Sequence, residues 1–353
     1  MTGQQLPQIN KENGLEFGLY TIGDFINSNN VKLSPKDRLN QIIEMAKLAE
    51  EAGLNVFQLG ESHQKHFISQ AHFSILSAIA TITDQIKLAT GATVLTTSDP
   101  VRVFEEAATI DLLSNERFEL VCGRAARTGS FDLLGYSLND YEELFEEKLN
   151  LLLEINKNEI VNWEGEFRSP LKGAQVLPRP ERPSNGLPIW RANAGTLNSA
   201  LKAAEAGIPL FMMHLRGDVS NYAEVIKQYR RKAEEKGHAN LPVATAGFLL
   251  PKHTTEAAFD TYYPRIANGM SKIGHSQFDS SEFSKDNLND SVMNVGSSDL
   301  IIEKILQQHE AFNHDRYVAQ IDFGGTTIDE IKETIDILGT KIVPEVKKHT
   351  KNK

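Results

Sequence analysis

The chain has 353 residues, of which 40% are hydrophobic and 24% charged, as is typical of a soluble globular protein. Its formal net charge of −10 argues against nucleic-acid binding and against attachment to an anionic membrane surface. The single cysteine, Cys122, excludes an internal disulfide. Because we find neither a signal-peptide pattern nor an apolar run of about twenty residues, we expect a cytoplasmic protein.

The first part of the chain alternates between strand and helix patterns. Residues 15–20 and 54–59 predict strands, and Ser34–Pro35 predicts the start of a helix between them. Residues 71–83 predict a helix that is apolar nearly all round, which is typical of burial on more than one side.

That apolar helix also bears on assembly. We expect a lone chain to leave part of it uncovered, and therefore predict a homodimer with residues 71–83 and 101–113 at the interface. The alternative is that the helix is fully covered by its own chain.

Residues 86–124 form the clearest unit of the sequence. The apolar run 86–95 is followed by Asp99–Pro100, a carboxylate cap and a first-turn proline that start the helix 101–113. A second apolar run, 117–122, ends at Gly123–Arg124. A strand–helix–strand unit favours parallel strands with a right-handed crossover, so both strands should finish at the same edge.

The second half of the chain continues the alternation. Residues 139–157 predict an acidic amphipathic helix, and the stretch 160–188 predicts an irregular hairpin and a proline-stiffened connection. Further strands are expected at 188–192, 209–213, 243–250 and 316–322, with helices at 196–206, 218–236, 297–312 and 326–338.

The stretch 253–291 is long and rich in serine, asparagine and aspartate. It follows the seventh predicted strand and is too long for an ordinary connection, so we predict a mobile lid insertion. The alternative is a tolerated surface insertion.

Eight strands separated by helices predict an α/β fold, a single (β/α)₈ TIM barrel domain over 1–353 with insertions at the carboxyl ends of the strands. The active site of such a barrel lies at those strand ends. This rule selects the following residues: Glu61, Ser62, His63, Gly91, Ala92, Arg124, Arg127, Arg191, Asn193, Ala194, Gly195, Thr196, His214, Asp322, Gly324 and Gly325.

Two groups of these strand-end residues could bind a phosphate. Residues 193–196 lead directly into a helix, where backbone N–H groups and the helix dipole favour an anion, and Thr196 or Ser199 can add a hydroxyl. Arg124 can supply a planar, charged fork. The alternatives are an ordinary threonine cap and a surface salt bridge. His63 and His66 lack a third metal ligand at a sensible spacing, so we expect no metal site.

Several segments carry a family resemblance: ATGATVLTTSDPVRVFEEAATIDLLSNERFEL with Gly-Arg at 123–124, LPIWRANAGTLNSALKAAEAGIPLF, VGSSDLIIEKI, and RYVAQIDFGG followed by LGTKIVPEV. Over residues 17–344 the chain resembles the bacterial luciferase-like flavin-dependent monooxygenases. The resemblance implies a barrel that binds flavin mononucleotide (FMN) at the strand ends. It matches Arg124 to the family's phosphate-binding arginine, Gly195, Thr196 and Ser199 to its phosphate loop, and Gly91–Ala92 to its non-prolyl cis peptide under the flavin ring.

The chain also departs from that family. It has Glu61-Ser62-His63 where luciferases carry Glu-His-His, and Gly123 where luciferase has a reactive cysteine. A further phosphate arginine is replaced near Tyr141–Glu142. Light emission is therefore not expected.

The resemblance implies an FMN-dependent oxidoreductase, a monooxygenase that uses reduced flavin and molecular oxygen on a small organic substrate, with a separate flavin reductase as a candidate partner. We expect His63 to be the catalytic histidine, with His214 as the competing candidate, and Glu61 and Arg191 to contact the substrate. The alternatives are a deazaflavin-dependent hydride transferase and a non-catalytic flavin-binding protein.

Overall fold

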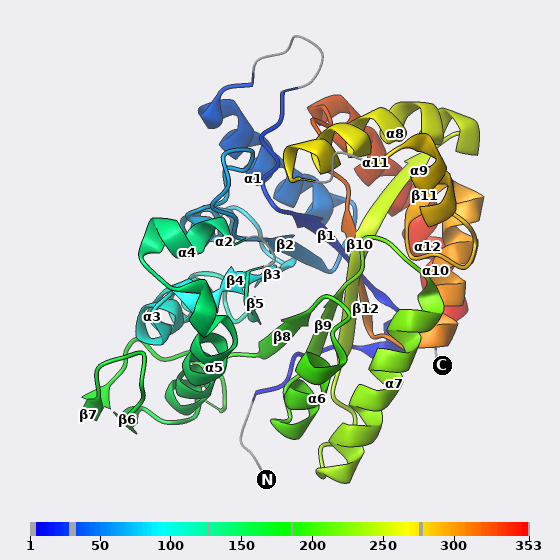
Figure 1. Cartoon of the computed structure of the whole chain (residues 1–353). Helices are drawn as coiled ribbons and strands as arrows, with labels where there is room; N and C mark the ends of the chain where they lie inside the picture. The colour runs from blue at the N-terminus through cyan, green and yellow to red at the C-terminus, as the bar shows by residue number, and fades with distance from the viewer. Residues whose placement is uncertain (1–4, 28–32, 126–127, 185, 275–277, 352–353) are drawn as a thin grey trace.

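A computed structural model describes residues 5–27, 33–125, 128–184, 186–274 and 278–351. Within these residues, eight parallel strands close into a barrel surrounded by helices (Figure 1), as the sequence predicts. Around the ring the strands are β1 (Glu16–Thr21), β2 (Val56–Leu59), β3 (Lys87–Thr90), β5 (Phe118–Gly123), β8 (Ile189–Asn193), β9 (Leu210–Met213), β10 (Val243–Lys252) and β12 (Arg316–Gln320).

The ring closes because β12 pairs with both β10 and β1. All pairs around the ring are parallel, so the carboxyl ends of the strands meet at one rim. Two short strands extend the sheet at this end: β4 (Thr93–Val94) pairs with β5, and β11 (Asn294–Ser297) pairs with the end of β10. The hairpin expected after residue 160 consists of β6 (Ile160–Trp163) and β7 (Leu171–Gln175).

The helices begin at the predicted signals. The carboxylate of Asp99 accepts the N–H groups of Val101 and Arg102, and Pro100 occupies the first turn. The helices are α1 (Pro35–Glu51), α2 (His72–Ala80), α3 (Pro100–Leu113), α4 (Gly129–Leu134), α5 (Tyr141–Lys157), α6 (Leu197–Glu205), α7 (Val219–Glu235), α8 (Thr255–Lys272), α9 (Ser280–Asp286), α10 (Ser298–Phe312), α11 (Ile328–Ile337) and α12 (Val343–Thr350). None within the described ranges is long and apolar enough to cross a membrane.

A buried ion network fills the amino end of the barrel. Arg316 donates to both carboxylate oxygens of Glu119, at 2.7 and 3.0 Å, and its Nε donates to Glu16 at 2.9 Å. Trp190 adds an indole N–H to Glu119 at 2.8 Å. Burial alone would raise the pKa of Glu119, but the charge of Arg316 outweighs it and holds that pKa below its ordinary value. The carboxylate therefore stays charged inside the barrel.

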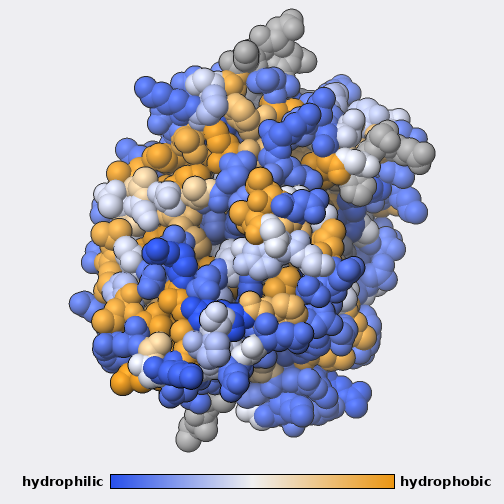
Figure 2. Space-filling view, turned by 60° about the vertical axis from the view of Figure 1, so that its left-hand side comes forward, coloured by the Kyte–Doolittle hydropathy of each residue, from blue (hydrophilic) through white to orange (hydrophobic). Residues whose placement is uncertain are grey.

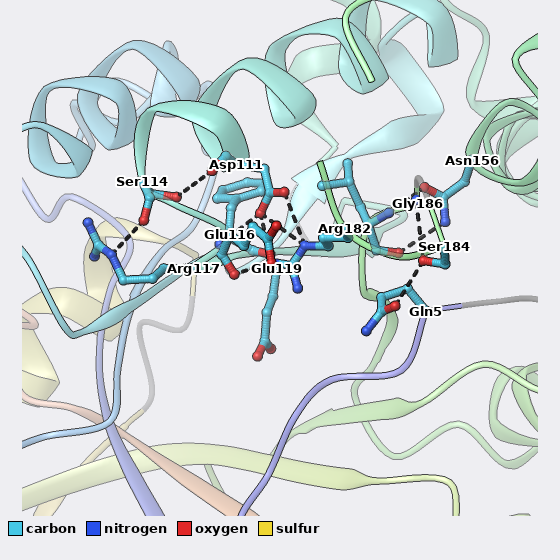
Figure 3. A network of polar contacts seen from close by, with 12 residues as sticks. Gln5, Asp111, Ser114, Glu116, Arg117, Glu119, Asn156, Arg182, Ser184 and Gly186 are labelled. Atoms are coloured by element: carbon cyan, nitrogen blue, oxygen red, sulfur yellow. Dashed lines mark hydrogen bonds and ion pairs between the residues drawn. The ribbon is translucent and has the colours of Figure 1, made fainter. Parts of the chain in front are cut away.

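Arg182 anchors the proline-stiffened connection to α3 (Figure 3). Its Nη2 and Nε donate hydrogen bonds to the buried carboxylate of Asp111 at 2.7 and 3.0 Å. Arg182 also donates to the carbonyl oxygens of Glu116 and Phe118. The anchor therefore places β8 beside β5 and fixes where the strand-end residues of β8 begin.

The stretch 253–291, for which the sequence analysis predicts an insertion but no helix, is largely helical. Its described part contains α8 and α9, and buried Tyr262, Ile266 and Met270 recur at helical spacing on α8. The abundant serine, asparagine and aspartate residues obscured this pattern. Whether the segment closes over a ligand stays a prediction, and residues 275–277 lie outside the described chain.

The structure covers most, but not all, of the two apolar segments behind the homodimer expectation, since Ile82 is 42% exposed and Leu113 is 48% exposed. The apolar side of α2 is covered by its own chain, with Phe73, Ile75, Leu76 and Ile79 all buried. Figure 2 shows the face that carries this part of the chain, where apolar patches are separated by hydrophilic residues. The homodimer itself stays a prediction.

A second buried cluster explains an expected acid sensitivity. The ring of His214 lies among Tyr222, Phe312 and Tyr317, with centroid distances of 5.6, 5.8 and 6.1 Å. Burial lowers the pKa of His214 to about 4. In the unfolded chain an imidazole titrates near ~6.5, so the unfolded state binds more protons between these two values.

We therefore predict that acid destabilises the fold through His214. The free energy of unfolding should fall by about 2 kcal/mol from this residue as the pH drops from 7 to 5. His214→Leu should remove that part of the pH dependence, as measured by urea unfolding at both pH values. His253→Gln, which changes an exposed histidine, is the control. Equal pH dependence in wild type and His214→Leu would contradict the prediction.

Candidate active site

A cavity of about 200 Å³ opens at the carboxyl ends of the barrel strands. Its lining holds many of the expected strand-end residues together with Gly123: Glu61, Ser62, His63, Gly91, Ala92, Arg124, Asn193 and Ala194. Arg127 lies outside the described residues. Its apolar wall contains Ile22, Val94, Phe211, Met213 and Leu215. The structure therefore brings together residues from strands that are far apart in the sequence.

The Gly91–Ala92 peptide on this lining is cis, which confirms the expectation from the resemblance. Strand β2 holds it on both sides, since Gly91 donates to Leu59 at 2.9 Å and Glu61 donates to the carbonyl of Ala92 at 3.2 Å. A side chain at Gly91 would lie 2.9 Å from the ring of Tyr20, so only glycine fits.

Glu61 and His63 form a hydrogen-bonded pair at the cavity. One carboxylate oxygen of Glu61 lies 2.6 Å from Nε2 of His63, and the other accepts the N–H of Val94 at 2.6 Å. The Glu61 carboxylate is thereby fixed in place and orients the imidazole. Because an imidazole exchanges protons near neutral pH, this pair can hold or move a proton at the cavity.

Two buried hydroxyl groups on the lining have no hydrogen-bond partner among the described residues: Oγ of Ser62 and Oγ of Ser130. Buried polar groups are nearly always paired, so both are suited to a polar ligand. The sequence analysis missed Ser130, which lies in the first turn of α4, six residues after Arg124 in the segment that follows β5.

Arg124 is the only lysine or arginine on the lining within the described chain. Its guanidinium carbon lies 5.6 Å from the centre of the Tyr141 ring, and Nη1 forms an ion pair with Glu142. Its own carbonyl accepts the hydroxyl of Thr96 at 3.0 Å. Arg124 is therefore held at the cavity by its side chain and by its backbone.

The loop 193–196 differs in part from the expectation. The side-chain oxygen of Asn193 accepts the N–H groups of Gly195 and Thr196, at 2.6 and 2.9 Å, so these two donors are not free for a phosphate. Helix α6 begins directly afterwards without a side-chain cap. The uncapped first turn of α6 is thus the anion-attracting part of this loop.

Besides Gly195 and Thr196 of the loop just described, Arg191, Ser199 and His214 also lie outside the cavity lining. Arg191 forms two bonds with Glu146 on α5, at 3.0 and 2.6 Å, and donates to Ser199 on α6 at 3.2 Å. His214 lies in the aromatic cluster described above. Arg191 and His214 therefore do not reach the cavity, and Ser199 lies in the first turn of α6, so the roles expected for these residues stay predictions.

The physical reason is strand alternation. Successive side chains of a strand point to opposite faces. On β8, Ala192 lines the cavity, so Arg191 points outward to the helices. Met213 at the end of β9 and Leu215 just after it line the cavity, so His214 between them points outward. As to metals, the described residues contain no group of three or more histidine, cysteine or acidic side chains that could hold one.

The sequence profile of a family described as luciferase-like monooxygenase matches residues 16–314. The N-acetyl-S-alkylcysteine monooxygenase of Bacillus subtilis is 27% identical over 233 residues, which cover 63% of this chain and 64% of the relative.

Solved structures share the fold. The oxygenating constituent of 3,6-diketocamphane monooxygenase from Pseudomonas putida, solved with FMN, superposes with a TM-score of 0.73 at 18% identity, covering 94% of this chain and 99% of that one. A coenzyme F420-dependent secondary alcohol dehydrogenase superposes with a TM-score of 0.72 at 16% identity, covering the same shares.

Proposed function

The chain belongs to the luciferase-like monooxygenase family, and on this premise we propose that it is an FMN-dependent monooxygenase. Its reaction would use reduced flavin and molecular oxygen on a small organic substrate. The observation that carries the proposal is that one cavity combines the cis Gly91–Ala92 peptide, the cation Arg124, the Glu61–His63 pair, and the hydroxyls of Ser62 and Ser130, which have no partner among the described residues.

These residues fit a flavin with a phosphate. Bound reduced flavin would supply the redox chemistry with oxygen. Arg124 and the first turn of α6 would hold the phosphate, and the unpaired hydroxyls would bind polar atoms of the ligand.

The chain's own residues would then prepare the substrate. The apolar wall would exclude water and contact the apolar part of the substrate. His63, oriented by Glu61, would exchange a proton with the bound substrate. Because one structural neighbour is named as the oxygenating constituent of its enzyme, we propose that a separate reductase supplies the reduced flavin here as well.

The cofactor separates the alternatives. Purified protein would be supplied with reduced FMN, or with a reduced deazaflavin coenzyme, and with isotope-labelled oxygen. The proposal expects labelled product with FMN only. If the protein instead transfers hydride from the deazaflavin without oxygen, the deazaflavin alternative replaces the monooxygenase proposal. The deazaflavin coenzyme is included because the fold is similar to that of a coenzyme F420-dependent enzyme. Flavin binding without turnover of a broad substrate panel would favour a binding protein.

Removing the side chain of Arg124 should discriminate between phosphorylated and unphosphorylated flavin. Arg124→Ala should weaken FMN about tenfold or more, because a charge-assisted hydrogen bond contributes about 1.5–3 kcal/mol, and should leave riboflavin nearly unchanged. Flavin fluorescence titration measures both affinities. Arg102→Ala, at an exposed arginine on α3, is the control. Equal losses for FMN and riboflavin would place the phosphate elsewhere.

Removing the imidazole of His63 should uncouple oxygen consumption from product formation. His63→Ala should divert oxygen to hydrogen peroxide while FMN affinity stays within about threefold, or ~0.7 kcal/mol. The ratio of product to hydrogen peroxide is the measurement. His66→Ala, in the same loop but away from the cavity lining, is the matched control. If His63→Ala fails to retain flavin, His63 is a binding residue and its catalytic role is wrong.

A further inference from the structure

We propose that Glu142 is a built-in competitor of the cofactor phosphate at Arg124, so that binding exchanges a carboxylate for a phosphate on one guanidinium. Glu142 would thereby set how tightly the site takes phosphorylated flavin. This inference rests on the proposed function, and it concerns a residue of this chain that stands where an additional cation would strengthen the site.

The ion pair lies at the lining of the cavity. Arg124 supplies the only lysine or arginine there within the described chain, and its Nη1 bonds to Oε1 of Glu142. The Arg124 side chain is 15% exposed, whereas that of Glu142 is 47% exposed. The carboxylate is therefore the partner with room to move into solvent.

Charge explains why the carboxylate must move. A phosphate that bonds to Arg124 while Glu142 remains there would bring two anions onto one cation, and like charges at such short range repel. Moving Glu142 away removes that repulsion and frees the guanidinium for a bidentate bond to the phosphate.

The displaced carboxylate has a favourable place to go. Glu142 is the second residue of α5, and the amino end of a helix attracts negative charge. Displacement thus keeps one favourable interaction, which makes the exchange readily reversible. Tyr141 holds the backbone of this turn near Arg124 by donating its hydroxyl to the carbonyl of Ala125 at 2.9 Å.

The pair also has a use before any ligand arrives. A largely buried arginine without a counter-charge is strongly unfavourable, so Glu142 keeps the Arg124 side chain in position. The expected result is a site that accepts and releases phosphorylated flavin, in keeping with a cofactor supplied by a separate protein.

The test measures the dissociation constants of FMN and riboflavin by fluorescence titration. Glu142→Gln should tighten FMN about fivefold and leave riboflavin unchanged, because a half-exposed ion pair is worth about that factor. Glu143→Gln is the matched control, since it removes the same charge from the next residue, which is exposed. In an Arg124→Ala background, Glu142→Gln should have no selective effect on FMN.

The outcomes distinguish the two proposals. If wild type binds FMN more tightly than riboflavin but Glu142→Gln leaves FMN within about twofold, or weakens it, the competitor role is wrong while the proposed function stands. The competitor role would also be wrong if Glu142→Gln tightened riboflavin as much as FMN, or if Glu143→Gln tightened FMN as much as Glu142→Gln does. If wild type binds neither flavin, both proposals are overturned.

Discussion

The bidentate bond between Arg316 and Glu119 is the constraint on which the rest of the barrel depends. These residues lie near the amino ends of β12 and β5, which stand on opposite sides of the eight-stranded ring, so the bond spans the lumen. Glu16 ties β1 to the same guanidinium, and Trp190 ties β8 to Glu119. Shifting one of these strands would leave a buried charge unpaired, which is strongly unfavourable.

The position of the site follows from that constraint. Parallel strands of similar length that begin at one level also end at one level, so the residues after β2, β5 and β8 arrive at the same rim. The Arg182–Asp111 anchor adds a second fixed point between β5 and β8. The ion pairs that fix the strands thus lie at the end of the barrel opposite to the one where chemistry is proposed.

Sequence reasoning predicted the eight strands and the rim because both follow from local pattern. Sequence reasoning was insufficient where the role of a residue depends on the face of the strand that its side chain occupies. His214 directly follows β9 and Arg191 is the middle residue of β8, but alternation turns both toward the helices, and an apolar run of four or five residues does not reveal which face is inside. Ser130 and the Arg124–Glu142 pair depend on contacts across loops and helices, which no local pattern encodes.

The separation of the ion network from the apolar cavity wall also has an evolutionary consequence. Met213 and Leu215 line the cavity at the carboxyl ends of the strands, whereas Arg316, Glu119 and Glu16 lie near the amino ends of theirs. Proteins that share this barrel can therefore diverge in ligand specificity while the arrangement of the strands stays the same. Substitutions at the partly buried Met213 and Leu215 should therefore reshape the cavity wall at a lower cost in stability than substitutions at the buried Val94 and Phe211.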